Sequence, residues 1–212
     1  MKAGFKLSEV KPNIFFLDFK DPYNLAMHFV RFQEYYESPS KKFRCKDFDI
    51  FDFMEAYSKK YGNGIFTYPR DWSGFNIPSK VFYNCLIGIK NKNKYDIAMA
   101  DVYNEISSKT NSFYIIGSVG NEALTHEIAH GLYYTNKQYK KEMLDLVNNL
   151  DKSFYNKFTK YLIKIGYTKS VLKDEVQAYL STGMPESFEM TQKEKDYIKS
   201  IKKKFVKTYK NY

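Results

Sequence analysis

Residues 126–130 read His-Glu-Ile-Ala-His, and this short stretch constrains the fold and the chemistry of the chain more than any other. On an α-helix, side chains four residues apart lie above one another on the same face. His126 and His130 can therefore offer two imidazole nitrogens to one metal ion, with Glu127 beside them. The chain has 3 histidines in 212 residues, so this spacing favours a metal site over a coincidence of ordinary helix residues.

The residue types in this motif suit zinc-dependent hydrolysis. A bound zinc ion lowers the pKa of its water to roughly 7, and a neighbouring carboxylate can accept the proton as that water attacks a carbonyl group. Glu127 is the residue placed to act as this base. We therefore expect one Zn²⁺ ion, bound in part by His126 and His130.

The sequence around the motif predicts a helix buried beneath a cleft, because uncharged residues surround the two histidines. Asn121 is a suitable N-cap, and the helix is expected to continue to about Asn136. Residues 112–118 form the clearest strand of the chain, and Val119 and Gly120 follow it directly. The expected order is therefore a strand leading straight into the metal-binding helix.

The predicted strand before the motif is placed to form the rim of the cleft. An extended peptide could pair with its edge by β-augmentation, which makes Tyr114, Ile115, Ile116 and Gly117 the expected substrate-binding residues. The alternative is an interior strand that never meets substrate. Residues 70–79 form a dense loop that could wall the cleft, or could be a surface loop held by its aromatic side chains.

A catalytic zinc ion commonly has three protein ligands and keeps a fourth position open. The metzincin pattern would place glycine and histidine where this chain has Tyr133 and Asn136, and the remaining histidine is far upstream. A carboxylate is therefore the expected third ligand. An amphipathic helix predicted over residues 170–183 offers two adjacent candidates, Asp174 and Glu175.

The sequence Glu175-Val176-Gln177-Ala178 follows His130 by 45 residues. Together with the His-Glu-x-x-His helix it resembles the gluzincin metallopeptidases, in which a glutamate on a later helix, often followed by x-x-Ala, completes the metal site. The resemblance implies a zincin-like fold, with His126, His130 and Glu175 as zinc ligands and Glu127 as the general base. It covers these two helices and the strand before the first.

This sequence departs from the gluzincin pattern at one position. Some gluzincins have an acidic residue directly after that alanine to hold a ligand histidine, whereas this chain has Tyr179. Asp174 could supply such a supporting carboxylate, or could replace Glu175 as the ligand. We assign Tyr179 a catalytic role as a donor to the polarised carbonyl oxygen, with Tyr133 and Tyr134 as alternatives. For each of the three, the other interpretation is an ordinary packed tyrosine.

The rest of the sequence predicts a mainly helical α+β fold with a small mixed sheet around the active-site helix. Caps followed by apolar residues at helical spacing indicate helices, and aromatic or β-branched runs indicate strands. The expected strands cover residues 14–19, 64–69 and 112–118. The expected helices cover residues 22–37, 49–62, 79–89, 95–106, 121–136, 140–150, 152–165, 170–183 and 191–209.

The length and composition predict one globular metallohydrolase domain over residues 1–212. An organisation in two lobes is the alternative, with residues 1–110 carrying the cleft loop and residues 111–212 carrying the metal-binding helices and a basic C-terminal helix. The 2 cysteines are too few for a disulfide framework, and the first ten residues lack the apolar region of a signal peptide. We therefore expect a cytoplasmic protein that is not inserted in a membrane.

The net charge of +10 is concentrated at the C-terminal end. From Thr191 onward, eight lysines stand against Glu194 and Asp196. Thr191 and Glu194 form a capping box that predicts a helix with its lysines toward water. Nucleic acid is compatible with this charge but is not favoured as a partner, because no base-stacking or recognition motif accompanies it.

These features predict a zinc-dependent metallopeptidase whose partner is a peptide or protein substrate. One alternative is a regulatory zincin-like protein that binds nucleic acid or another protein and has little or target-restricted hydrolase activity. Another is zinc-dependent hydrolysis of an amide that is not a peptide.

Overall fold

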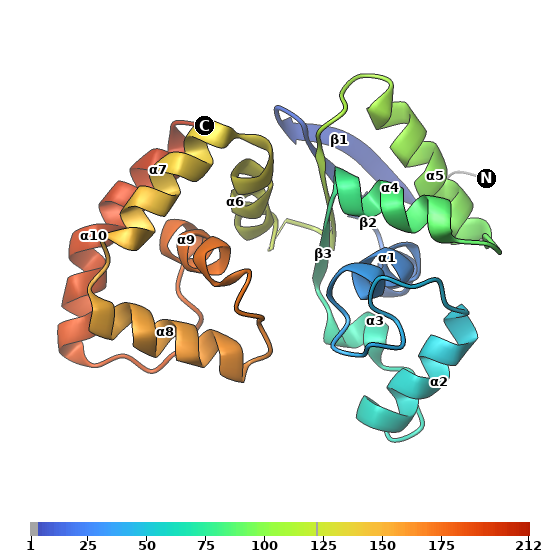
Figure 1. The fold of residues 1–212 in the computed structure, drawn as a ribbon, viewed down its shortest axis with the longest axis horizontal. Helices are drawn as coiled ribbons and strands as arrows, with labels where there is room; N and C mark the ends of the chain where they lie inside the picture. The colour runs from blue at the N-terminus through green and yellow to red at the C-terminus, as the bar shows by residue number, and fades with distance from the viewer. Residues whose placement is uncertain (1–3, 122) are drawn as a thin grey trace. The chain divides into compact units, whose positions relative to one another are not determined.

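The computed structural model describes residues 4–121 and 123–212, which divide into two compact units (Figure 1). The first unit is Met1–Leu124 and the second is Thr125–Tyr212. The division falls later than the expected lobe boundary after residue 110. The reason is that the strand over residues 114–119, expected in the second lobe, is hydrogen-bonded into the sheet of the first unit.

The first unit is built on a mixed four-stranded sheet in the order β1-β2-β4-β3. Its strands are β1 (Phe5–Lys11), β2 (Ile14–Phe19), β3 (Gly74–Pro78) and β4 (Tyr114–Val119). β1 and β2 form an antiparallel hairpin, β2 runs parallel to β4, and β3 is antiparallel to β4. Asn13 at the hairpin turn has a φ of 62°, a conformation that asparagine tolerates. The predicted small mixed sheet is confirmed.

The helices of the first unit follow their N-terminal caps. They are α1 (Pro22–Glu37), α2 (Ile50–Tyr61), α3 (Tyr68–Asp71), α4 (Ser79–Gly88) and α5 (Lys94–Ser107). Asp21 accepts a hydrogen bond from the backbone nitrogen of Asn24 at 2.8 Å, and Pro22 begins the helix, as the sequence predicts. Asn93 and Asp96 form a capping box that starts α5.

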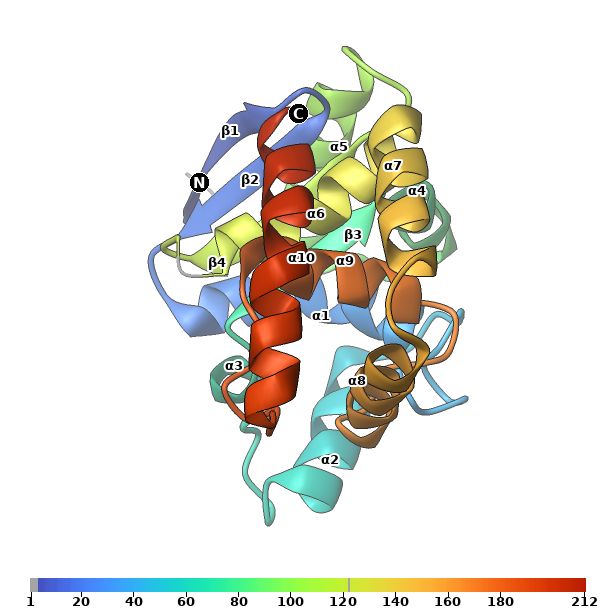
Figure 2. The ribbon, with the colours of Figure 1, turned by 90° about the vertical axis from the view of Figure 1, so that its left-hand side faces the viewer.

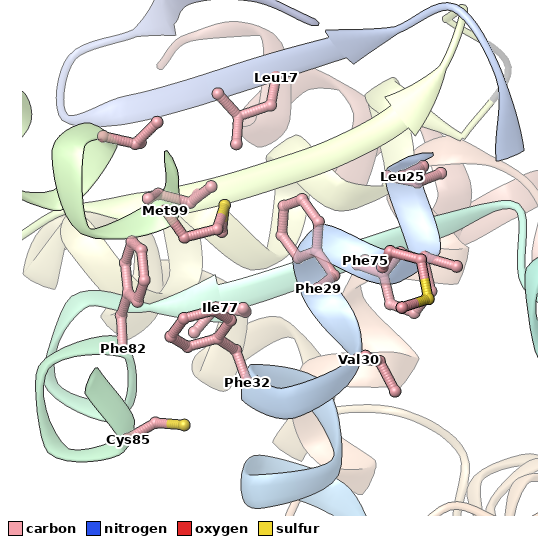
Figure 3. Close-up of a cluster of buried hydrophobic side chains, with 14 of the residues drawn as sticks. Leu17, Leu25, Phe29, Val30, Phe32, Phe75, Ile77, Phe82, Cys85 and Met99 are labelled. Atoms are coloured by element: carbon pink, nitrogen blue, oxygen red, sulfur yellow. The ribbon is translucent and has the colours of Figure 1, made fainter. Parts of the chain in front are cut away.

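The core of the first unit lies between the sheet and these helices (Figure 3). Phe29 of α1 stacks on Phe75 of β3, with ring centroids 5.5 Å apart. Gly117 of β4 lies directly against this contact, and a Cβ atom there would overlap the ring of Phe29. The glycine therefore allows α1 to approach the sheet closely.

Two predictions for residues 64–79 are wrong. The expected strand over residues 64–69 does not form: residues 64–67 are turn and loop, and the short helix α3 begins at Tyr68 with a proline in its first turn. The expected loop contains β3, which pairs with β4 along Gly74–Pro78. A strand with glycine and proline at its ends has little intrinsic β-propensity, so its pairing with β4 decides its conformation. β1 was not predicted, although its first residues alternate polar and apolar side chains.

The second unit consists of helices that surround α9 (Figures 1 and 2). They are α6 (Leu124–Thr135), α7 (Lys137–Asn148), α8 (Lys152–Lys164), α9 (Leu172–Thr182) and α10 (Gln192–Lys210). α9 packs against α7, α8 and α10. The motif helix α6 begins three residues after Asn121, where the cap was expected.

The other helices of the second unit begin and end within two residues of the prediction, except that α7 begins at Lys137, three residues before the expected Lys140, because Asn136 caps it. The side chain of Asp151 accepts a hydrogen bond from the backbone nitrogen of Phe154, and the capping box of Thr191 and Glu194 is present. Gly166 has a φ of 114° where α8 ends, as expected of a glycine at that position. Among the described residues, no helix combines the length and the apolar character needed to cross a membrane.

Candidate metal centre

The two motif histidines face each other on α6. His126 and His130 have their Nε2 atoms 3.2 Å apart, and their ring centroids are 4.8 Å apart in an edge-to-face arrangement. The helical spacing of four residues brings the rings together, as the sequence predicts. His130 is buried and His126 is half-buried.

Glu175 of α9 approaches both imidazoles. Its Oε2 atom lies 3.8 Å from Nε2 of His126, and its Oε1 atom lies 3.6 Å from Nε2 of His130. One potential ligand atom from each of these residues lies within 4.8 Å of the others. His126, His130 and Glu175 can therefore hold a metal ion together.

The other nitrogen of each histidine is already bonded to α9. Nδ1 of His130 lies 2.9 Å from Oδ1 of Asp174, and Nδ1 of His126 lies 3.2 Å from the hydroxyl of Thr182. The Thr182 hydroxyl donates its own proton to the carbonyl of Ala178 at 2.8 Å, so it accepts from His126. Both Nδ1 atoms therefore act as donors, so in the neutral imidazoles the lone pair lies on Nε2.

The two Nε2 atoms and the Glu175 carboxylate thus lie close together. Among the described residues, Oε2 of Glu175 is buried and has no hydrogen-bond partner, which is costly for a carboxylate oxygen. A tetrahedral zinc ion with bonds of about 2.0–2.1 Å would space its ligand atoms roughly 3.3 Å apart. The two Nε2 atoms, 3.2 Å apart, fit this spacing, whereas the Glu175 distances of 3.6 and 3.8 Å are longer and end on different carboxylate oxygens.

Asp174 and Glu175 take different positions in this site. Asp174 bonds to Nδ1 of His130, on the side of the ring opposite to Glu175. A carboxylate on the outer nitrogen of a ligand histidine is typical of metal centres, where it fixes the ring orientation. Glu175 therefore lies where it could be a ligand together with the two Nε2 atoms, and Asp174 lies behind His130.

The carboxylates around His130 favour the protonated form of its imidazole. Burial opposes protonation of this imidazole, but the carboxylates of Asp174 and Glu175 outweigh burial and raise its pKa well above the ordinary value. The negative charge that favours a proton here would equally favour a metal cation. Metal binding at His130 is thus expected to displace a proton.

Tyr179 lies beside the candidate ligand His126. The Tyr179 ring packs against His126, with centroids 4.6 Å apart, and its hydroxyl lies 3.4 Å from that of Tyr167. Burial, followed by the charges of Glu175 and Glu127, raises the pKa of Tyr179. Tyr179 is therefore a neutral hydrogen-bond donor beside the metal ligands. The two alternative tyrosines lie elsewhere on α6: Tyr133 packs under the Lys140 ammonium at 4.6 Å, and the side chain of Tyr134 is partly exposed.

The expected pairing of substrate with β4 is wrong. β4 is an interior strand whose two edges are hydrogen-bonded to β2 and β3, so a peptide cannot pair with it. All four residues expected to bind substrate there, Tyr114, Ile115, Ile116 and Gly117, are buried. The alternative of an interior strand describes β4 correctly.

Sequence reasoning missed Tyr167 and Thr182. Tyr167 follows the glycine that ends α8, and its backbone nitrogen bonds back to Leu162, which directs the chain toward the site. Thr182 lies seven residues after Glu175 on one helix, so the two share a face. That spacing is a signal that could have identified Thr182.

No protein family, curated protein or solved structure matches this chain. Two imidazoles and one carboxylate are one of the donor sets found in catalytic zinc sites, which keep a coordination position open for water or substrate.

Proposed function

We propose that this protein is a zinc-dependent metallopeptidase with a zincin-like fold of the gluzincin type. One observation carries the proposal: the Nε2 atoms of His126 and His130 and the carboxylate of Glu175 converge, while both Nδ1 atoms are held by α9. A zinc ion bound there would polarise a substrate carbonyl and make water more acidic. A peptide bond is a carbonyl substrate that requires both effects.

Glu127 is proposed as the general base. It precedes Ile128 on the helix that carries both histidine ligands, and its charge acts on His130, Tyr167 and Tyr179. In this role, the carboxylate accepts a proton from the attacking water and later donates it to the leaving amine. The oxygen of that water forms the new bond to the carbonyl carbon while the carbon–nitrogen bond breaks.

Tyr179 is proposed to donate a hydrogen bond to the carbonyl oxygen as negative charge develops on it. The ring is held between His126 and Phe158, at centroid distances of 4.6 and 5.8 Å. This packing limits the directions that the hydroxyl can take. Its proximity to a ligand histidine favours Tyr179 over other tyrosines of the chain.

The Glu127→Gln variant tests this proposal. Zinc content is measured by elemental analysis, and cleavage of a peptide library is followed by mass spectrometry. We expect the variant to bind zinc like the unmodified protein and to lose turnover by about 10²–10⁴-fold, because the amide cannot accept the proton. Glu189→Gln, which alters an exposed carboxylate in the same unit, is the matched control and should retain full turnover.

Two results would contradict the proposal in different ways. Failure of the unmodified protein to bind zinc would remove the metal centre. Zinc binding without cleavage of any library peptide would leave the metal centre intact and favour hydrolysis of an amide that is not a peptide.

The second candidate function is regulatory binding of nucleic acid or protein. It is favoured by the exposed lysines along α10, which include Lys199, Lys203, Lys207 and Lys210 at near-helical spacing. A nucleic acid bound by these lysines would dissociate as salt is raised. Such binding should persist in Glu127→Gln, which separates this function from hydrolysis.

A further inference from the structure

A buried glutamine joins the two helices of the candidate metal centre. Gln177 on α9 is 0 % exposed, and its side-chain nitrogen lies 3.0 Å from Oδ1 of Asp174 and 3.3 Å from the carbonyl of Ala129. Ala129 immediately precedes His130 on α6. The same oxygen of Asp174 also accepts the hydrogen bond from Nδ1 of His130.

These contacts fix the orientation of the Gln177 amide. Both groups near its nitrogen are acceptors, a carboxylate and a carbonyl, so the amino end must point toward them. The amide oxygen then faces Tyr139 of α7, whose hydroxyl donates to it at 2.8 Å. Tyr139 is also 0 % exposed. A chain of buried hydrogen bonds therefore runs from Tyr139 through Gln177 and Asp174 to His130.

Asp174 needs such support because of its position. The side chain of His130 is 6 % exposed, whereas that of Asp174 is 27 % exposed. A partly exposed carboxylate can turn toward water and release the imidazole, since hydrated and bonded states differ little in free energy. A bond from a fully buried amide opposes that rotation, because turning away would leave a buried donor unsatisfied.

We infer that Gln177 and Tyr139 are positioning residues that hold Asp174 against Nδ1 of His130 and thereby direct Nε2 of His130 toward the metal ion. The inference rests on the proposed metal centre and extends it to two residues that touch neither metal nor substrate. Gln177 positions Asp174 directly. Tyr139 acts one step further away, by fixing the amide of Gln177.

The test compares Gln177→Met and Tyr139→Phe with the unmodified full-length chain. Methionine fills a similar volume without the amide, and phenylalanine removes a single hydroxyl. Zinc affinity is measured by competition with a chelating dye. We expect a loss of about 10–100-fold for Gln177→Met, the range found when groups that support metal ligands are altered. Tyr139→Phe should also lower the zinc affinity, but by a smaller factor.

Two controls separate positioning from a general loss of stability. Val147→Ala removes buried volume from α7 without removing any polar group, and should lower the denaturation midpoint while zinc affinity stays unchanged. Gln138→Met makes the same chemical change at an exposed position of α7. This variant should change neither the denaturation midpoint nor the zinc affinity.

Proton exchange at Nδ1 of His130, followed by NMR, provides a measurement that does not depend on zinc. The proton should exchange slowly in the unmodified protein and faster in Gln177→Met. Unchanged exchange together with unchanged zinc affinity in Gln177→Met would overturn the inference. If the unmodified protein binds no zinc but Gln177→Met still speeds the exchange, the proposed function fails and the positioning role stands.

Discussion

The hydroxyl of Thr182 receives a hydrogen bond from Nδ1 of His126 at 3.2 Å and gives its own proton to the carbonyl of Ala178 at 2.8 Å. Because its proton is committed to the helix backbone, the hydroxyl is available to His126 as an acceptor. This bond sets the tautomer of His126 in the same way that Asp174 sets that of His130. A single helix, α9, therefore supplies one proposed ligand and the supports of the other two.

Thr182→Val should weaken zinc binding. Valine keeps the shape of threonine but cannot accept a hydrogen bond, so Nδ1 of His126 loses its partner. We expect zinc affinity to fall by about 10–100-fold, measured by competition with a chelating dye. Thr182→Ser keeps the hydroxyl and should retain most of the affinity. Equal affinities for the valine and serine variants would show that the Thr182 hydroxyl does not orient His126.

Tyr179→Phe should reduce turnover without changing zinc affinity. The phenol is proposed to stabilise charge that develops during the reaction, and removal of such a donor costs about 10²–10³-fold in turnover. Tyr161→Phe removes a hydroxyl that bonds Ser187 in the same unit and should leave turnover unchanged. A parallel fall of zinc affinity in Tyr179→Phe would assign the tyrosine to metal binding instead.

Tyr167 should act through Tyr179, because their hydroxyls lie 3.4 Å apart. Tyr167→Phe is expected to reduce turnover less than Tyr179→Phe does. The double variant should be no slower than Tyr179→Phe alone, since residues that act as a unit are not additive. Steady-state rates of the three variants on one peptide substrate measure this coupling, and additive losses would place the two tyrosines in independent roles.

The sequence predicts those parts of the site that depend on local spacing. The four-residue step from His126 to His130 requires only a helix, and a helix is readable from caps and apolar periodicity. Glu175 could be proposed as the third ligand because the helix predicted over residues 170–183 carries two adjacent carboxylates. The sequence left open whether Asp174 or Glu175 is the ligand, because the answer depends on how α9 lies against α6, and helical spacing within α9 does not specify that packing.

The fold shows the same division between local and long-range information. Capped helices such as α1 and α10 were predicted nearly to the residue, because their caps lie beside them in sequence. β3 was missed because its strand conformation depends on pairing with β4, about 40 residues later. The same pairing occupies an edge of β4 and makes it an interior strand, in agreement with its run of five consecutive buried residues.

The first unit should lose stability as the pH falls through about 6.5. His28 is buried among Phe5, Phe19 and Tyr95, and burial lowers its pKa below the model-peptide value of 6.5. The unfolded chain therefore binds a proton at a higher pH than the folded chain. Below that pH the free energy of unfolding should fall, by at most about 1.4 kcal/mol per pH unit for one proton, until the folded state is also protonated.

His28→Gln tests this dependence, because glutamine cannot titrate. Trp72 is the single tryptophan of the chain and lies in the first unit, so its fluorescence reports the unfolding of that unit. The free energy of unfolding is measured by urea denaturation at several pH values between 7.5 and 5. It should fall less steeply with decreasing pH for the variant than for the unmodified protein. The same dependence on pH in both proteins would mean that His28 titrates alike in the folded and unfolded chains.

Gly117→Ala should destabilise the first unit far more than Gly74→Ala. Both glycines lie in paired strands, and neither has a φ in the left-handed region, so alanine is compatible with both backbones. At residue 117 a Cβ atom would overlap the ring of Phe29, and overpacking of this kind costs about 1–3 kcal/mol. At residue 74 the nearest atoms would be 3.6 Å away, an ordinary contact, so the change should stay within about 0.5 kcal/mol. The stability of both variants is measured by urea denaturation followed by Trp72 fluorescence. Equal denaturation midpoints would show that α1 can move away from β4 without a loss of stability.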